Sequence, residues 1–184
     1  MKITTIGRGT IGGTLGRLWA AAGHDVTQLG RDGGDAGDAD VVLLASPGTV
    51  VPEALAAVSG LHGKVILDAT NRIGDQAPPD GYPSVAEYVK ATTGGAVAKV
   101  FHLNFGAILE QAADNPKRPS NLWVGDEGAR DAVERLSADI GMEAVFGGPL
   151  ERAATAEAFT EILITIFQDA GAPVFYRFAT PQDL

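Results

Sequence analysis

The chain of 184 residues contains no cysteine, which excludes disulfides, thiolate nucleophiles, iron–sulfur clusters and cysteine-ligated zinc. Positive charge is also scarce, since 14 Lys and Arg stand against 23 Asp and Glu and give a net charge of −9. No local cluster of basic residues offsets this charge. Because such a chain repels phosphate backbones, we expect no nucleic-acid partner.

Long apolar runs are missing too, and none approaches the length that spans a bilayer. The first residues lack the charged and apolar blocks of a signal peptide. The three histidines and the scattered carboxylates show no metal-ligand spacing. We therefore expect a cytoplasmic protein with no membrane contact and no metal site. Its length and its 45% hydrophobic content suit one globular domain with a small appendage.

The most informative pattern that is present lies at residues 2–12. A short β-branched stretch runs into Gly7-Arg8-Gly9-Thr10-Ile11-Gly12, and a helix-like segment follows to Ala22. In a Gly-x-Gly-x-x-Gly turn the first glycine permits the tight turn, the second lets backbone approach a pyrophosphate, and the third lets helix and strand pack closely. The N–H groups of the helix then hold the phosphates. We interpret the pattern as a dinucleotide-binding turn; the alternative is a purely structural glycine-rich turn.

Short apolar stretches alternate with helix-like segments along the chain. We predict strands at residues 2–6, 25–29, 40–45, 64–69, 98–101 and 121–124. Helices are predicted from Thr10 to a cap at Gly23, after the capping box of Ser84 and Glu87, and from Asp126 to Gly141. This alternation predicts an α/β fold, a Rossmann-type doubly wound parallel sheet with a small C-terminal helical segment.

One connection departs from this alternation. Residues 31–39 are too few and too rich in Gly and Asp for a crossover helix, so we expect a loop there. We divide the chain into a nucleotide-binding Rossmann domain, residues 1–148, and a C-terminal helix and tail, residues 149–184.

The end of the second predicted strand indicates which nicotinamide cofactor binds. Enzymes that use NAD usually have an acid there for the ribose hydroxyls, whereas this chain has Gly30 followed by Arg31. Because an arginine can bond a ribose phosphate and stack on adenine, we favour NADP(H). Two alternatives remain: Asp32 can contact the ribose hydroxyls instead, and Arg31 can be a surface residue paired with Asp32.

Polar residues directly follow three other predicted strands. In open parallel sheets the ligand crevice lies at the carboxyl ends of the strands, so Ser46, Pro47, Thr70, Asn71 and His102 should converge beside the glycine turn. We expect Ser46 and Pro47 to line the cofactor path, and Thr70 and Asn71 to bond the nicotinamide carboxamide. The alternative for Ser46, Thr70 and Asn71 is helix capping.

His102 is the candidate catalytic residue, because histidine can donate a proton or a hydrogen bond near neutral pH. The alternative is a packed structural histidine. Hydride transfer itself needs two rings held face to face and no covalent nucleophile.

The chain resembles the F420-dependent NADP oxidoreductase family over nearly its whole length. The motifs that carry this resemblance are Gly7-Arg8-Gly9-Thr10-Ile11-Gly12, Gly23-His24-Asp25-Val26 with Gly30-Arg31, residues 40–47, residues 63–71, Lys99-Val100-Phe101-His102, Val124-Gly125-Asp126 and residues 147–151. The resemblance implies an enzyme that transfers hydride between NADP(H) and coenzyme F420, a deazaflavin, as co-substrate.

Two other functions stay open. The first is an NADPH-dependent reductase of a small imine or ketone, for which His102 is the candidate proton donor. The second is a non-enzymatic NADP(H)-binding regulatory module.

The last predicted helix carries an apolar stripe at Ala158, Phe159, Ile162, Leu163, Ile166 and Phe167. This face either packs against the chain's own sheet or joins two subunits and completes the pocket of the small-molecule acceptor. The family resemblance favours a homodimer.

Overall fold

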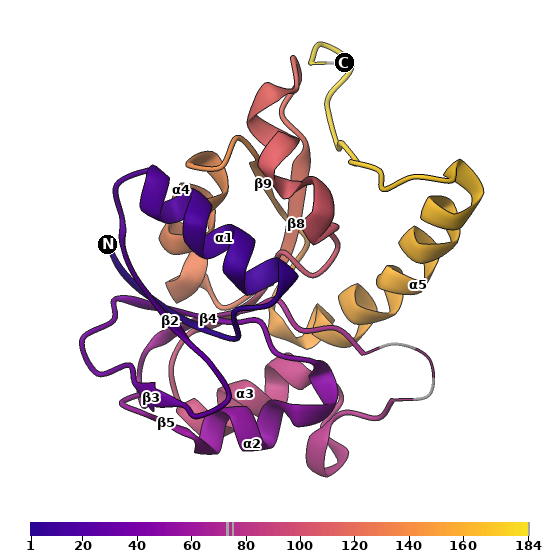
Figure 1. Ribbon diagram of the computed structural model, residues 1–184. Helices are drawn as coiled ribbons and strands as arrows, with labels where there is room; N and C mark the ends of the chain where they lie inside the picture. Colours follow the sequence, from indigo (N-terminus) through magenta and orange to yellow (C-terminus); the bar gives the residue numbers. More distant parts are fainter. Residues whose placement is uncertain (73, 75, 184) are drawn as a thin grey trace.

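The computed structural model describes residues 1–72, 74 and 76–183 and shows an α/β fold built on a seven-stranded sheet (Figure 1). The strand order is β2-β1-β4-β6-β7-β8-β9. The strands are β1 (Lys2–Ile6), β2 (Asp25–Leu29), β4 (Val41–Leu44), β6 (Val65–Asp68), β7 (Val97–Lys99), β8 (Ser120–Gly125) and β9 (Glu143–Phe146). The first five are mutually parallel, β8 runs antiparallel to β7, and β9 is parallel to β8. The prediction of an α/β fold with a doubly wound parallel sheet and a C-terminal helix is confirmed, with β8 as an antiparallel strand and β9 as a strand that was not predicted.

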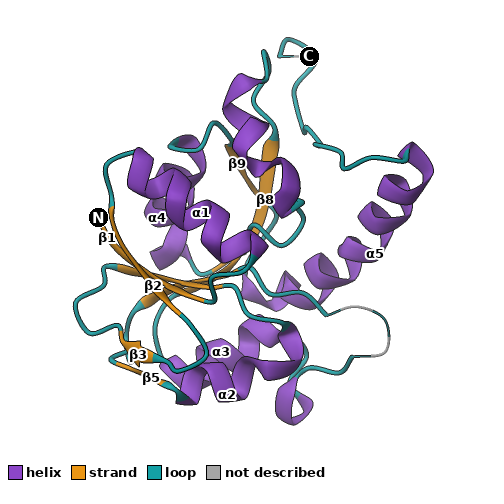
Figure 2. Cartoon of the chain, in the orientation of Figure 1, coloured by secondary structure: helices purple, strands orange, loops and turns teal. Residues whose placement is uncertain are grey.

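Helices cover both faces of this sheet (Figure 2). The helices are α1 (Thr10–Ala21), α2 (Val51–Ala56), α3 (Val85–Thr93), α4 (Arg130–Ala138) and α5 (Ala153–Ala170). Short 3₁₀ turns are η1 (Gly48–Val50), η2 (Pro79–Gly81), η3 (Gly106–Asp114), η4 (Glu127–Ala129) and η5 (Leu150–Arg152). Helices α1 and α4 lie on one face, and α2 and α3 on the other. The capping box ahead of α3 is confirmed, since Ser84 Oγ accepts the backbone N–H of Glu87 at 3.1 Å.

The connection from β2 to β4 has no helix, as the sequence predicts. It contains only the two-residue strand β3 (Gly34–Asp35), which pairs with β5 (Val58–Ser59) in a separate small sheet. The ammonium of Lys64 donates to the carbonyl oxygen of Ala39 at 2.8 Å and fastens the loop to the edge of the main sheet. The segment beside the end of β2 is therefore a short loop that contains one two-residue strand.

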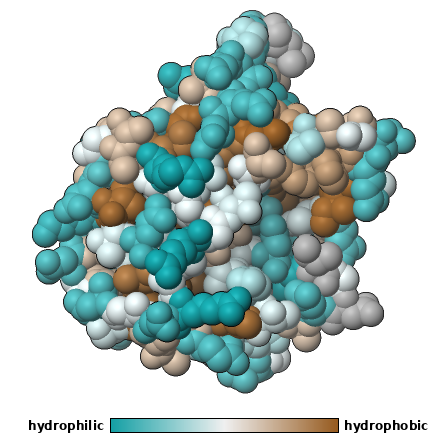
Figure 3. Space-filling view, in the orientation of Figure 1, coloured by the Kyte–Doolittle hydropathy of each residue, from teal (hydrophilic) through white to brown (hydrophobic). Residues whose placement is uncertain are grey.

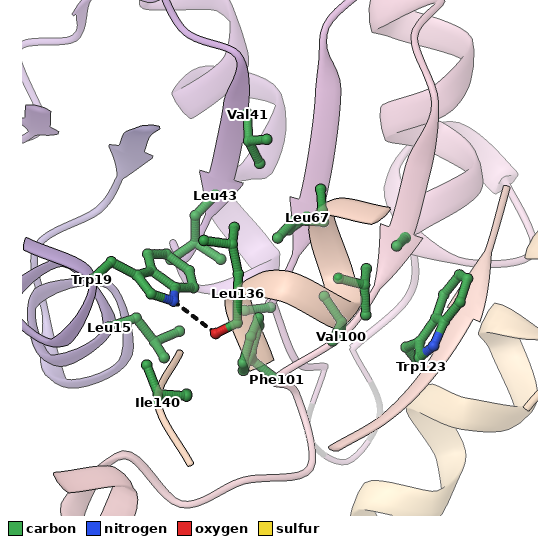
Figure 4. Close-up of a cluster of buried hydrophobic side chains, with 14 of the residues drawn as sticks. Leu15, Trp19, Val41, Leu43, Leu67, Val100, Phe101, Trp123, Leu136 and Ile140 are labelled. Atoms are coloured by element: carbon green, nitrogen blue, oxygen red, sulfur yellow. Dashed lines mark hydrogen bonds between the residues drawn. The ribbon is translucent and has the colours of Figure 1, made fainter. Parts of the chain in front are cut away.

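The core on the α1 and α4 face is built around an aromatic pair. Trp19 is fully buried and its indole N–H donates to the carbonyl oxygen of Leu136 at 2.9 Å (Figure 4). Its ring meets Phe101 edge-on, with 5.7 Å between centroids. This pair joins α1, α4 and the end of β7, so the helix that follows the glycine turn is held rigidly against the sheet.

The first half of α5 packs on the domain, while its second half projects away from it (Figure 1). Ala153, Ala156 and Leu163 are buried, whereas Ile162 and Ile166 are 53% and 46% exposed. The predicted stripe is thus divided between a core face and an exposed face. The tail returns to β8, where the backbone N–H of Ser120 donates to the carbonyl oxygen of Tyr176 at 2.8 Å.

Two searches of the described residues gave negative results. No helix in that part of the chain is long and apolar enough to cross a membrane. The same residues contain no group of three His, Asp or Glu side chains placed to hold a metal ion.

Candidate functional site

The glycine turn has the geometry that its sequence pattern requires. Gly7 has φ of +102°, and a Cβ atom there would lie 2.5 Å from the carbonyl oxygen of Ala45. A Cβ atom on Gly12 would overlap the carbonyl oxygen of Gly7. These contacts bring α1 close to β1 and place the turn directly beside the end of β4, where the strand order changes direction.

Gly9 differs from the other two glycines because the space beside it is open. It is the N-cap of α1 with φ of −74°, and a Cβ atom there would meet nothing within 4 Å. Helix α1 has neither a side-chain cap nor an acidic residue in its first turn, which begins with Thr10 and Ile11. The first N–H groups of the helix therefore face open space with no protein acceptor, as an anion-binding helix start requires.

Two arginines lie at the end of β2. A Cβ atom on Gly30 would lie 2.8–3.0 Å from three guanidinium atoms of Arg8, so the guanidinium of Arg8 lies across Gly30. Arg31 follows at once, and both arginines are exposed. Within the described part of the chain neither makes an ion pair, although Arg17, Arg72, Arg130, Arg135 and Arg177 all do. The alternative, an ion pair between Arg31 and Asp32, is not found among the described residues.

The loop after β4 provides a buried hydroxyl without a partner. Ser46 Oγ is buried and makes no hydrogen bond with any described residue. The N-cap of η1 is Pro47, and η1 has no side-chain cap, so Ser46 does not cap the following turn. A buried polar atom left unpaired is costly unless a ligand or water satisfies it. The position of Ser46 between the Gly7 turn and η1 therefore fits a ligand contact.

The side chains of Thr70 and Asn71 have different hydrogen-bond partners. The hydroxyl of Thr70 donates to Asp68 Oδ1 at 2.6 Å and is fully buried inside the domain. The side chain of Asn71 instead bridges two elements: its Nδ2 donates to the carbonyl oxygen of His102 at 2.6 Å, and its Oδ1 accepts the hydroxyl of Thr160 on α5 at 3.1 Å. The loops after β6 and β7 and helix α5 thus meet at Asn71.

A buried ionic network lies beneath these loops, and the sequence reasoning missed it. Lys99 is fully buried at the end of β7, and its ammonium lies 3.1 Å from Asp68 Oδ2 and 3.4 Å from Glu157 Oε1. It also donates to the carbonyl oxygen of Thr70 at 2.5 Å. Glu157 accepts in addition from Arg72 Nε at 2.8 Å and from the backbone N–H of Val85 at 3.0 Å.

The network holds the carboxyl end of β6 in place, because Lys99 contacts both Asp68 and Thr70. Burial raises the pKa of the Asp68 carboxyl, while the Lys99 ammonium and the Thr70 hydroxyl oppose that shift. The sequence did contain a signal for this network. Two apolar strands end in a charged residue: Val-Ile-Leu-Asp ends at Asp68, and Val-Ala-Lys ends at Lys99. The partner Glu157 carries no such signal, because it belongs to a helix far along the chain.

His102 is buried, 3% exposed, and held in one orientation. Its Nε2 lies 3.2 Å from the carbonyl oxygen of Ala156, so Nε2 carries the proton and Nδ1 carries a lone pair. Nδ1 is buried without a hydrogen-bond partner among the described residues. Burial, assisted by the nearby Lys99 charge, lowers the pKa of His102 to about 3. The ring is therefore neutral at physiological pH and can accept a hydrogen bond at Nδ1, but it has no proton there to donate.

A pocket of about 290 Å³ opens between these loops and α5. Its described lining comprises Asn71, His102, Leu103, Asn104, Phe105, Gly106, Thr160, Leu163, Ile164 and Phe167. The rings of Phe105 and Phe167 pack with 4.9 Å between centroids and join the loop to the projecting half of α5. A Cβ atom on Gly106 would lie 2.7 Å from Thr10 Cγ2, so the pocket adjoins the start of α1. Of the predicted strand-end residues, Asn71 and His102 line this crevice, whereas Ser46, Pro47 and Thr70 are not among its described lining residues.

The crevice and the glycine turn define a Rossmann-type α/β domain, and solved structures share this fold. A provisionally assigned F420-dependent NADP reductase from Arthrobacter sp. FB24 superposes with a TM-score of 0.81 at 21% identity, over 98% of this chain and all of that one. The hypothetical protein SMa0349 from Sinorhizobium meliloti gives 0.65 at 24% identity, over 83% and 86% of the two chains. An imine reductase from Streptomyces aurantiacus gives 0.66 at 17% identity, over 93% of this chain but only 63% of its own length.

Comparisons by sequence gave no match. No protein-family model matches the chain, and no curated protein matches it. At these identities the likeness to the solved structures establishes the fold.

Proposed function

We propose that this chain is an NADPH-dependent oxidoreductase that transfers hydride between NADP(H) and an acceptor of the deazaflavin F420 type. The observation that carries the cofactor assignment is the pair of unpaired arginines at the end of β2, with Gly30 where an acid would select NAD. In a chain of net charge −9, two exposed guanidinium groups without carboxylate partners next to a phosphate-binding turn suit a ribose phosphate.

The residues present fit such a dinucleotide at three points. The N–H groups at the start of α1 would hold the pyrophosphate beside the open face of Gly9, and the unpaired hydroxyl of Ser46 would gain a partner next to Pro47. Arg8 and Arg31 would hold the phosphate on the ribose. When bound, the nicotinamide supplies hydride chemistry. Asn71 lines the pocket and would orient the nicotinamide end with its remaining amide proton. The hydroxyl and the backbone N–H of Thr70 both donate to Asp68, so Thr70 would shape the loop rather than bond the carboxamide.

His102 would take part as a hydrogen-bond acceptor in the acceptor pocket. Its protonated Nε2 is held by Ala156, so the role of proton donor that the sequence suggested does not match its geometry. This favours an acceptor whose reduction needs no dedicated acid, as when developing charge on a deazaflavin ring is stabilised by N–H groups or water.

The names of the similar structures support the same chemistry. One is a provisionally assigned F420-dependent NADP reductase, and others are an imine reductase and a reductive aminase solved with NADPH and ethyl levulinate. The compact pocket of about 290 Å³ favours a small imine or ketone as the second candidate acceptor.

The cofactor assignment is tested by titrating the protein with NADPH and NADH. We expect Arg8→Ala and Arg31→Ala each to weaken NADPH about tenfold and to leave NADH unchanged, because each removes one charge-assisted hydrogen bond to the phosphate. Arg118→Ala, at an exposed arginine away from the turn, is the matched control and should change neither affinity. Equal losses for both nucleotides would contradict recognition of the ribose phosphate.

The division of the chain and its assembly are also part of the proposal. Residues 1–148 form the nucleotide-binding domain and residues 149–184, of which the structure describes all but the last, contribute the pocket wall. The exposed apolar face of α5, with Ile162 and Ile166, suits contact with a second copy (Figure 3). Sedimentation equilibrium should then give twice the chain mass of 19.0 kDa, and a single-chain mass would contradict the homodimer.

A further inference from the structure

The side chains that line the acceptor pocket carry no charge. Among its ten described lining residues, the apolar ones are Leu103, Phe105, Leu163, Ile164 and Phe167, and the polar ones are two asparagines, a threonine and the neutral His102. At about 290 Å³ the pocket lies at the lower end of the 300–1,000 Å³ or so that is typical of small-molecule sites. It therefore suits a compact group with a large apolar surface.

The charges of the buried network beneath the pocket are paired with one another in the described part of the chain. Lys99 lies against Asp68 and Glu157, and Arg72 bonds Glu157 and the carbonyl oxygen of Gln76 at 2.7 Å. Lys99 and Glu157 are no more than 2% exposed, so neither can turn toward a ligand without breaking the network.

An anionic group would find no counter-charge in this lining. Burying an ionised carboxylate or phosphate without a partner is strongly unfavourable.

We propose that the pocket takes its acceptor as an uncharged, largely apolar group, and that negative charge elsewhere on the molecule adds nothing to recognition. This inference rests on the proposed function and specifies its substrate class. Two sources share this chemistry: the ring system of a deazaflavin with its ring hydroxyl protonated, to which F420 adds an anionic side chain, and a small neutral ketone or imine. In either case NADPH gives a hydride and solvent gives a proton, so that NADPH, H⁺ and the acceptor yield NADP⁺ and the two-electron-reduced acceptor.

Two matched pairs of acceptors test the proposal. The first pair is the deazaflavin core with an uncharged ribityl chain against complete F420, and the second is a cyclic ketone against a 2-oxo acid with the same number of non-hydrogen atoms. NADPH oxidation is followed at saturating NADPH, and binding to the protein loaded with NADP⁺ is measured by calorimetry. One of the two pairs should be reduced by the protein. In that pair we expect the neutral compound to have a kcat/KM at least equal to that of the anionic compound. A tenfold preference for the anion, or no binding of either neutral compound, would overturn the proposal.

A charge placed in the lining sharpens the test. Ile164→Arg adds a cation to the pocket and should raise the preference for the anionic member of the pair at least tenfold. Thr165→Arg adds the same cation at the next residue, which is exposed and does not line the pocket, and should leave the preference unchanged. An unchanged preference in Ile164→Arg would count against the pocket as the acceptor site. Failure of the unmodified protein to bind NADPH would instead overturn the proposed function.

Discussion

The two ends of the crevice differ in how many of their polar groups have a protein partner. At the nucleotide end Arg8, Arg31 and the hydroxyl of Ser46 have no protein partners, and the first turn of α1 has no cap. At the pocket end nearly every polar group is bonded to another: Asn71 to Thr160 and His102, and Lys99 to its neighbours. One end therefore has polar groups left without partners among the described residues, whereas the polar groups of the other end bond to one another.

This difference separates binding from stability. A change at the nucleotide end removes contacts that exist only with a ligand, so it should alter affinity and leave the fold intact. A change in the network beneath the pocket leaves buried charges without partners, so it should alter the free energy of unfolding first.

The largest effect is expected from Lys99→Met, which leaves Asp68 and part of Glu157 without a buried counter-charge. Breaking a buried pair by removing one partner costs about 3–5 kcal/mol, so urea denaturation should show a loss of that size. In Lys99→Met/Asp68→Asn about half of the loss should return, because Asn keeps an acceptor for Thr70 but carries no charge. A loss below about 1 kcal/mol in the single variant would contradict a tightly paired network.

Gly9→Val should lower nucleotide affinity and leave the free energy of unfolding almost unchanged. Its backbone has a φ of −74°, which any residue can adopt, and a Cβ atom there meets no protein atom within 4 Å, so the unfolding free energy should hardly change. Because the added side chain occupies the space where a pyrophosphate would approach, NADPH and NADH affinity should both fall about a hundredfold, or about 2.7 kcal/mol. Fluorescence titration gives the affinity and thermal unfolding gives the stability. Retained nucleotide binding would refute the role of the turn.

A smaller, pH-dependent effect belongs to His102. Its pKa is lowered to about 3 in the folded chain, so below the ordinary value of about 6.5 only the unfolded chain takes up this proton. Stability from this group is complete above pH 6.5 and is lost as the pH falls toward 3. Between pH 6.5 and 5 the loss should be about 2 kcal/mol.

The corresponding variant is His102→Gln, whose amide can still donate to Ala156 but does not titrate. The difference in unfolding free energy between the two proteins should therefore shrink by that amount as the pH falls from 6.5 to 5. A difference that stays constant over this range would mean that His102 titrates normally in the folded chain.

The nucleotide end could be predicted because its determinants are neighbours in the sequence. Gly7, Gly9 and Gly12 act within one turn, and their spacing fixes which of them must be small for packing and which faces open space. The meeting of Asn71 and His102 also followed from the sequence, since parallel strands bring their carboxyl ends to one edge of the sheet.

The remaining features depend on pairings that no local pattern specifies. Residues 121–124 were predicted as a strand, but no local pattern specifies that β8 runs antiparallel to β7. Strand β9 has no buried residue that would mark it as a strand. Glu157 resembles a surface residue of an amphipathic helix, yet it is 2% exposed because Lys99, Arg72 and the start of α3 surround it. The orientation of the His102 ring likewise depends on a carbonyl group of α5, 54 residues away.

The contribution of α5 also sets the order in which the site is completed during synthesis. A chain still attached to the ribosome has its glycine turn and its arginines long before Ala156, Glu157 and Thr160 emerge. Until then His102 lacks the carbonyl that holds its ring, Asn71 lacks its partner hydroxyl, and the first N–H of α3 lacks its carboxylate. Nascent chains therefore contain the glycine turn and both arginines before they contain the side chains that complete the pocket.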